Sequence, residues 1–163
     1  VYALDATSGE ERWRFDTGEN VNSSPAVYEG VVYIGGDHYL YALAAGTGEE
    51  RWRFDADNWV LSSPAVSEGM VYFGSYDQHV YALDATSGEE RWRFDTGENV
   101  QSSPAVCEGV VYVGGDHYLY ALAAETGREK WKFKTGDWVL SSPAVSEGMV
   151  YFGSLDGYLY ALE

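Results

Sequence analysis

Short runs of alternating apolar and polar residues follow one another along the whole chain, separated by turn-forming residues. Residues 1–39 contain four such runs, Val1–Leu4, Glu11–Phe15, Ser23–Val27 and Val31–Gly35. In the second run the apolar residues Trp13 and Phe15 alternate with arginines, as in a strand with one exposed face. No segment keeps the period of an amphipathic helix. The pattern therefore predicts four short β-strands within residues 1–39.

Glycine and proline mark the breaks between these runs. Pro25 has no backbone donor, so we expect it at a strand margin or a bulge. A glycine follows a glutamate in the turn between the third and fourth runs, where a tight hairpin needs positive φ. The equivalent glycines in the chain are Gly30, Gly69, Gly109 and Gly148.

The pattern of residues 1–39 recurs along the chain. We divide the single domain 1–163 into repeats 1–39, 40–79, 80–118 and 119–158, and residues 159–163 begin a fifth copy. The first and third copies differ only at Asn22/Gln101, Tyr28/Cys107 and Ile34/Val113. The amplified unit is therefore a pair of repeats, and a period of about 40 residues indicates units that bury apolar surface against their neighbours. The sequence predicts an all-β fold, a β-propeller with four blades of four antiparallel strands.

Composition excludes several classes of partner. Hydrophobic residues make up 45% of the chain and aromatic residues 16%, enough for a packed core. The formal net charge is −16, so we expect no nucleic-acid partner, because phosphates require cations. We also expect no membrane span, because no apolar run is long enough. The chain opens on Val1 without a signal peptide, which favours a processed or excised piece.

The acidic balance has two interpretations. Asp and Glu number 26 against 10 Lys and Arg, and lysine occurs only at Lys130, Lys132 and Lys134. Such a balance resembles proteins of salt-loving archaea, in which concentrated salt screens self-repulsion. An ordinary acidic surface is the alternative. Cys107 is the single cysteine, so no disulfide forms within the chain and the redox compartment is left open.

The motif Ala3-x-Asp5-x-x-Ser8-Gly9-x-x-x-Trp13 resembles the tryptophan-docking motif of the PQQ-like (quinoprotein-type) β-propeller repeat. The motif recurs in every copy, and the phrases Ser-Ser-Pro-Ala-Val, Gly-x-Val-Tyr and Leu-Tyr-Ala-Leu extend the likeness over the whole chain. In that family the Trp of one blade packs across the glycine turn of its neighbour. The resemblance assigns this docking role to Trp13, Trp52, Trp92 and Trp131 and to Gly9, Gly48, Gly88 and Gly127.

The even copies carry Thr47 and Thr126 in place of the motif serine, and they also lack its aspartate. Ala44 and Ala123 stand where Asp5 and Asp84 stand in the odd copies. We expect the two aspartates to bond backbone amides in their turns, and those bonds to be absent from the even copies.

The family's strand order also predicts how the ring closes. Ser-Ser-Pro-Ala-Val is the innermost strand, A, followed outward by strands B, C and D. The chain then begins with C and D of one blade and ends with A, B and C of another, so Leu159–Leu162 duplicates Val1–Leu4. We expect two chains to complete one eight-bladed ring as a homodimer, because twofold symmetry commonly satisfies a self-complementary edge. A closed four-bladed chain and a window from a longer protein are the alternatives.

Strands A and B are antiparallel, so the D–A loops and the B–C loops open on one face, which we name the loop face. The candidate residues for a ligand or protein partner on it are Asn20, Asp37, His38, Trp59, Asp77, Asn99, Asp116, His117, Trp138 and Asp156. Trp59 and Trp138 lie outside the docking motif, so each can serve as an aromatic platform or simply cover its blade. Two of the aspartates precede a histidine, a ligand pair that suits transition metals. We expect no metal, because two ligands are few and aspartate commonly forms turns.

Three function classes follow. PQQ-dependent dehydrogenases of this family would imply a quinone beside Ca²⁺, an Asp base and often a disulfide between adjacent cysteines. The chain has no cysteine pair and no distinctive insertion, so we expect no enzyme and no cofactor. We favour a non-catalytic scaffold for protein or ligand interaction, which resembles in class the propeller lipoprotein of the outer-membrane barrel-assembly machinery and would imply an extracytoplasmic location. The alternative is a purely structural array, recently amplified or engineered, without an evolved ligand.

Overall fold

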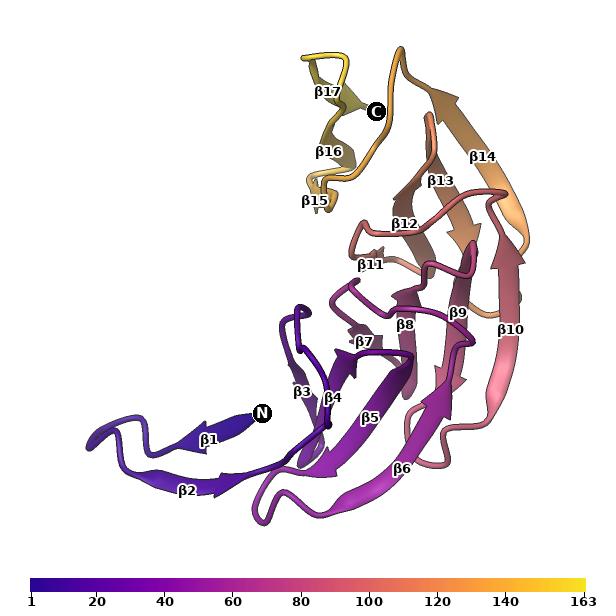
Figure 1. The fold of residues 1–163 in the computed structure, drawn as a ribbon. Helices are drawn as coiled ribbons and strands as arrows, with labels where there is room; N and C mark the ends of the chain where they lie inside the picture. Colours follow the sequence, from indigo (N-terminus) through magenta and orange to yellow (C-terminus); the bar gives the residue numbers. More distant parts are fainter.

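The computed structural model describes all residues, 1–163, and every regular element in it is a β-strand. The strands form three four-stranded antiparallel sheets, one three-stranded sheet and one two-stranded sheet. These sheets follow one another along an open arc (Figure 1). The predicted all-β propeller of four-stranded antiparallel blades is confirmed. The structure has no helix of the length and apolarity that crossing a membrane requires.

Each complete blade runs from an inner strand to an outer strand in chain order. Blade I consists of β3 (Ala26–Tyr28), β4 (Val31–Gly36), β5 (Tyr39–Ala44) and β6 (Glu50–Asp55). Blade II consists of β7 (Ala65–Ser67), β8 (Met70–Gly74), β9 (His79–Asp84) and β10 (Glu90–Asp95). Blade III consists of β11 (Ala105–Cys107), β12 (Val110–Gly115), β13 (Tyr118–Ala123) and β14 (Glu129–Lys134).

The two ends of the chain form partial blades. The hairpin of β1 (Tyr2–Leu4) and β2 (Glu11–Arg14) supplies strands C and D before blade I. After blade III, β15 (Ala144–Ser146), β16 (Met149–Gly153) and β17 (Leu159–Leu162) supply strands A, B and C. These two partial blades lie at opposite ends of the arc (Figure 1).

Strand A begins later than predicted. The sequence predicted a strand over Ser23–Val27, but β3 begins at Ala26, so Pro25 stands just outside it, at the expected margin. The first serine before the proline bonds to its own sheet, since Ser23 Oγ donates to Gly35 O of β4, whereas the backbone amide of the second serine bonds to the neighbouring blade. Ser24 N donates to Ser63 Oγ at 2.8 Å, Ser63 N to Ser103 Oγ at 2.9 Å, and Ser103 N to Ser142 Oγ at 3.1 Å. We name this chain of bonds along the concave side of the arc the serine ladder.

The hydrophobic core is divided into clusters that lie between adjacent sheets. The largest joins Tyr33 and Leu40 of blade I to Phe73 and Tyr81 of blade II. Corresponding clusters join blade II to blade III and each end blade to its neighbour. Each sheet thus buries its apolar residues against the next sheet, as the repeat period indicated.

The motif tryptophans bridge three of the blade junctions. Trp13 Nε1 donates to Ala45 O at 2.9 Å, Trp52 Nε1 to Ala85 O at 3.2 Å, and Trp92 Nε1 to Ala124 O at 2.8 Å. Each indole lies over the glycine of the turn that it bonds. A Cβ built on Gly48, Gly88 or Gly127 would lie 2.6 to 2.7 Å from indole ring atoms. We name this contact the docking junction. Its turn residue must be glycine for two reasons: a side chain would clash with the indole, and the backbone has a φ near +70°.

The A–B hairpins use a turn with two left-handed residues. The four predicted glycines have φ between +73° and +78°, and the glutamate before each also has positive φ, between +46° and +51°. Consecutive positive φ values are typical of the type I′ turn, whose twist matches that of the flanking strands. The prediction of positive φ at these glycines is confirmed, and the strained glutamates were not foreseen.

The docking junction predicts a difference between two glycines of equal backbone geometry. Gly88 and Gly109 both have a φ of +73°, but a Cβ at Gly88 would lie 2.7 Å from Trp52 Cδ2, whereas Gly109 has nothing within 4 Å. Gly109→Ala should cost about 1 kcal/mol of unfolding free energy through left-handed strain. Gly88→Ala should cost about 1–3 kcal/mol more, because the indole must also move. Urea unfolding measures both values, and equal losses would contradict this account.

Candidate functional site: the loop face

Backbone hydrogen bonds hold the D–A loops and the B–C loops together in one layer. After β6, Val60 N donates to Asp37 O of the same blade at 2.7 Å, and Tyr76 N of the next blade donates to Trp59 O at 2.9 Å. Equivalent bonds join Val139 N to Asp116 O at 2.8 Å and Leu155 N to Trp138 O at 2.9 Å. The D–A loops after β6 and β14 therefore each lie between two B–C loops, and the candidate residues of both loop sets share one face of the arc.

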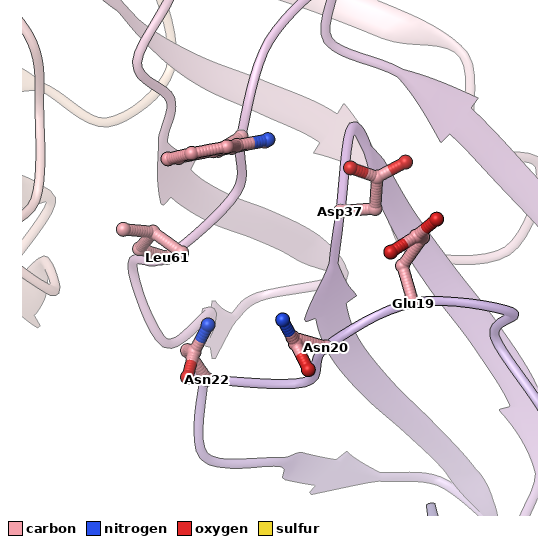
Figure 2. A pocket seen from close by; sticks show the side chains of 6 residues that line it. Glu19, Asn20, Asn22, Asp37 and Leu61 are labelled. Carbon is pink, nitrogen blue, oxygen red and sulfur yellow. The ribbon is translucent and has the colours of Figure 1, made fainter.

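A hollow of about 250 Å³ opens on this face between the start of the chain and blades I and II. Its lining residues are Glu19, Asn20, Asn22, Asp37, Trp59 and Leu61. The carboxylates of Glu19 and Asp37 lie next to one another at one side, and Asn22 and Leu61 lie at the other (Figure 2). The hollow thus combines four polar or charged side chains with the apolar side chains of Trp59 and Leu61.

Trp59 supplies the aromatic surface of this hollow. Its side chain is 51% exposed although the residue is large and apolar. Trp59 N donates to Asn58 Oδ1 at 2.8 Å, and the ring centroid of Tyr76 lies 6.1 Å from that of Trp59. The backbone of Trp59 is therefore fixed, while its indole remains available to another molecule.

The duplicated surroundings of Trp138 differ at several residues, because Asp137, Leu155 and Gln101 stand where Asn58, Tyr76 and Asn22 surround Trp59. Trp138 is also exposed, and Trp138 N donates to Asp137 Oδ1 at 2.8 Å. Gln101 stands in this copy where Asn22 stands in the first, and its Oε1 accepts a hydrogen bond from Tyr76 Oη at 3.0 Å. The longer amide is thereby tied to the neighbouring blade. Trp138 is accordingly a natural control for Trp59.

Two of the candidate aspartates are engaged in their own blades. Asp77 accepts hydrogen bonds from His79 N and from Tyr81 Oη, and burial together with this carboxylate raises the pKa of Tyr81. Burial alone would raise the pKa of Asp156, but hydrogen bonds from Tyr160 Oη, Gly136 N and Tyr158 N lower it overall. These carboxylates maintain the B–C turns.

The two Asp-His pairs also lie in B–C turns. Asp37 and Asp116 each have a φ of +52°, in the left-handed region that aspartate tolerates better than most residues. His38 Nε2 lies 3.3 Å from Asp37 Oδ1, and the second pair is spaced at 3.4 Å. No group of three or more His, Cys, Asp or Glu side chains is placed to hold a metal ion.

The remaining candidates are spread over the face. Asn20 lines the hollow, and Asn99 is exposed at the equivalent place in the third copy. Asn22 and Leu61 were not among the candidates, although they line the hollow with Trp59. One signal could have identified Asn22, because Asn22/Gln101 is among the few differences between the first and third copies.

The opposite face carries the C–D turns, in which Asp84 organises the backbone. Its Oδ1 accepts hydrogen bonds from Thr86 N and Ser87 N, and Arg91 Nη2 lies 2.8 Å from its Oδ2. The Arg91 hydrogen bond, followed by those from the turn, lowers the pKa of Asp84 from 3.8 to about 2. Asp5 makes the same contacts with Thr7, Ser8 and Arg12. Ala44 and Ala123 cannot, so the expected difference between odd and even copies is present.

The whole chain matches one protein family. That family is described as outer membrane protein assembly factor BamB, and the two overlapping matches span residues 1–102 and 77–163. No curated protein matches the sequence.

Two solved structures combine a similar fold with recognisable sequence similarity. The crystal structure of BamB from Moraxella catarrhalis is 25% identical, with a TM-score of 0.84, over 94% of this chain and 50% of that one. Quinohemoprotein alcohol dehydrogenase ADHIIG from Pseudomonas putida HK5 is 26% identical, with a TM-score of 0.77, over 87% of this chain and 29% of that one. The chain thus spans half the length of the first protein and less than a third of the second.

A designed protein shares the fold at lower identity. The computationally designed Ika4 protein is 15% identical, with a TM-score of 0.81, over 90% of this chain and 92% of that one. This similarity concerns the architecture alone.

The Asp84 turn predicts a pH-dependent stability difference. Because folding lowers the pKa of Asp84 to about 2, its ionised form stabilises the folded state above the ordinary pKa of 3.8. Asp84→Ala should therefore lower the free energy of unfolding at pH 7. The difference from wild type should shrink as the pH falls from about 4 towards about 2.

Arg91→Ala serves as the companion variant, because it removes the largest cause of the shift. In that variant NMR titration should place the pKa of Asp84 nearer to 3.8 than to 2. A difference between wild type and Asp84→Ala that grows on acidification would contradict the assignment.

Proposed function

We propose that this chain, which belongs to the family described as outer membrane protein assembly factor BamB, is a non-catalytic β-propeller scaffold whose loop face binds a partner. The observation that carries the proposal is the hollow beside Trp59, where an exposed indole lies among two carboxylates and two amides. A hollow in which apolar side chains lie beside a few placed polar groups is typical of a binding site. The family match to an assembly factor supports interaction rather than catalysis.

The partner that this chemistry favours is a positively charged protein segment. Glu19 and Asp37 carry negative charge at the hollow, and the chain as a whole has a formal net charge of −16. A lysine or arginine side chain can lie over the face of Trp59 and meet those carboxylates at its charged end. The acidic field would also speed the approach of such a segment.

The proposal includes a homodimer, in which two chains close one ring and their loop faces lie on the same side of it. A closed ring would leave no sheet edge exposed, and exposed edges favour unspecific pairing. It would also bring the Trp59 and Trp138 regions of both copies around one channel.

The residues of this chain do not fit a quinone cofactor with a calcium ion. The serines that line the concave side bond to one another in the serine ladder, and the chain has no adjacent cysteines. The B–C aspartates Asp77 and Asp156 accept hydrogen bonds within their own blades. Quinoprotein dehydrogenases are structural neighbours, but the donor set that their chemistry needs is not assembled here.

Calorimetric titration with a short peptide of alternating arginine and glycine tests the binding proposal. Trp59→Ala should weaken binding about three- to tenfold, the range expected when one cation–π contact is lost. Asp37→Asn should weaken it by a similar factor, because asparagine keeps the left-handed turn and removes only the charge. Affinity should also fall as the salt concentration rises.

Trp138→Ala is the matched control and should change the affinity less than Trp59→Ala. A peptide in which glutamate replaces arginine should not bind. Equal losses in the two tryptophan variants would overturn the assignment to this hollow. The absence of arginine-peptide binding would favour a structural array without an evolved ligand.

A further inference from the structure

The two ends of the arc carry matching halves of the contacts that join blades inside the chain. We infer that two copies of this chain close one ring by donating the β1–β2 hairpin of each to the β15–β16 sheet of the other, with β17 giving up its place. The inference rests on the homodimer in the proposed function and names its contacts. Four independent features support it.

The first feature is an unused docking junction. Trp131 is 39% exposed, whereas Trp92 is 8% exposed, and Trp131 Nε1 has no acceptor in the chain. Tyr112 packs against Trp131 with ring centroids 5.8 Å apart, as Tyr33 does against Trp52. Tyr33 Oη donates to Ala85 O, the carbonyl that Trp52 also bonds, but Tyr112 Oη has no such acceptor.

A glycine turn that could accept the Trp131 indole is present at the other end of the chain. Gly9 has a φ of +73° and nothing within 4 Å of its Cβ position, whereas Gly48, Gly88 and Gly127 each face an indole. By the repeat, Ala6 O occupies the place of Ala85 O. Trp131 of one copy can therefore dock on the Ala6–Gly9 turn of the second copy.

The second feature is a valine that lacks the glycine contact made by its equivalents in the other copies. Val60, Val100 and Val139 are each fully buried, and each packs against the glycine near the end of the preceding B strand. Val21 occupies the same place in the repeat but is exposed. The corresponding glycine at the other end is Gly153, whose Cβ position meets only Ser141. Val21 of one copy thus matches Gly153 of the other.

The third feature is the serine ladder. Inside the chain, the amide of each serine donates to the hydroxyl of the equivalent serine in the next blade. Ser142 N has no next blade, and no amide donates to Ser24 Oγ. One Ser142–Ser24 bond between copies continues the ladder in the same direction.

The fourth feature is the bare edge of β1. Tyr2 is 68% exposed and Leu4 57% exposed, whereas their equivalents Tyr41 and Leu43 are buried at 3% and 0%. A hollow of about 530 Å³ lies beside this hairpin, lined in part by Val1, Tyr2, Phe15 and Val21. This edge carries the apolar side chains of a C strand that lacks its B strand.

Within one chain, β17 occupies the edge of the B strand β16 at which β1 of the second copy would pair. It pairs with β16, and Tyr160 stacks on Phe152 at 5.2 Å, the same arrangement as Tyr81 on Phe73. The repeat places Tyr2 of the incoming hairpin at the position of Tyr160. The hairpin also brings the outer strand β2, which β17 lacks. One exchange can therefore replace the contacts of β17 and add a D strand.

A second copy is favoured over closure of one chain upon itself. The arc is open and its two ends lie far apart in the ribbon (Figure 1). Two copies related by a twofold axis would form two identical junctions, so both ends of both chains would be used. Charge agrees with this pairing: all three lysines of the chain lie on β14, beside the place of a hairpin that carries Glu10 and Glu11.

Light scattering after size exclusion, in low and in molar salt, tests the ring. The wild-type chain should elute as one species of twice the chain mass of 18.1 kDa. Gly9→Ala should raise the dimer dissociation constant at least about tenfold, because a methyl group would occupy the place of the Trp131 indole. Gly30→Ala is the matched control, with a φ of +75° and nothing within 4 Å, and should remain dimeric. A monomeric wild type, a ladder of sizes, or equal behaviour of the two variants would overturn the inference.

A chain ending at Tyr158 tests the exchange of strands. Because β1 takes the place of β17, this variant should dimerise at least as tightly as the wild type. Loss of the dimer on truncation would overturn the exchange. Failure of the peptide titration with an intact dimer would reject the proposed ligand, whereas a monomer that still binds the peptide would reject the ring.

Discussion

The seating of an indole on a glycine turn is the contact on which the rest of this structure depends. No single sheet of three or four short strands has two buried faces, so each must find a neighbour at a fixed distance and tilt. The docking junction sets both, because the indole reaches from an outer strand to the carbonyl of the next blade. A large buried aromatic residue of this kind contributes about 3–5 kcal/mol against truncation to alanine. Its hydrogen bond adds direction, because the carbonyl accepts from only a limited range of angles.

Much of this architecture could be predicted because the repeat presents the same evidence several times. Alternation in Arg12–Phe15 and the Glu-Gly turns indicated the number of strands in each repeat, whereas their order in the sheet followed from the family resemblance; both agree with the observed sheets. The start of strand A was wrong, since the backbone of Ser24 bonds across the junction to Ser63 rather than within its own sheet. The serines recur in every copy, but their recurrence does not tell which blade each one bonds to, and so the serine ladder was not foreseen.

The loop face was predictable as a face but not as a hollow. Antiparallel pairing of strands A and B places their loops together, and the structure shows the D–A and B–C loops bonded to one another. Asn22 lines the hollow, whereas the equivalent Gln101 of the third copy accepts a hydrogen bond from Tyr76 Oη. The near-identity of the copies therefore conceals a local asymmetry.

The serine ladder also gives the arc a sense of rotation. Every amide in it donates toward the carboxyl-terminal blade, and every hydroxyl accepts from the amino-terminal side. A blade added in reverse would place donor against donor, so growth in either direction must preserve the polarity, as in a polymer with unlike ends. The ladder does not determine the number of blades, because each serine bonds only to the equivalent serine of the next blade, whatever the size of the ring. The inner serines thus determine the direction in which blades follow one another, whereas the outer tryptophans determine the curvature. Selection could therefore alter the number of blades without altering that direction.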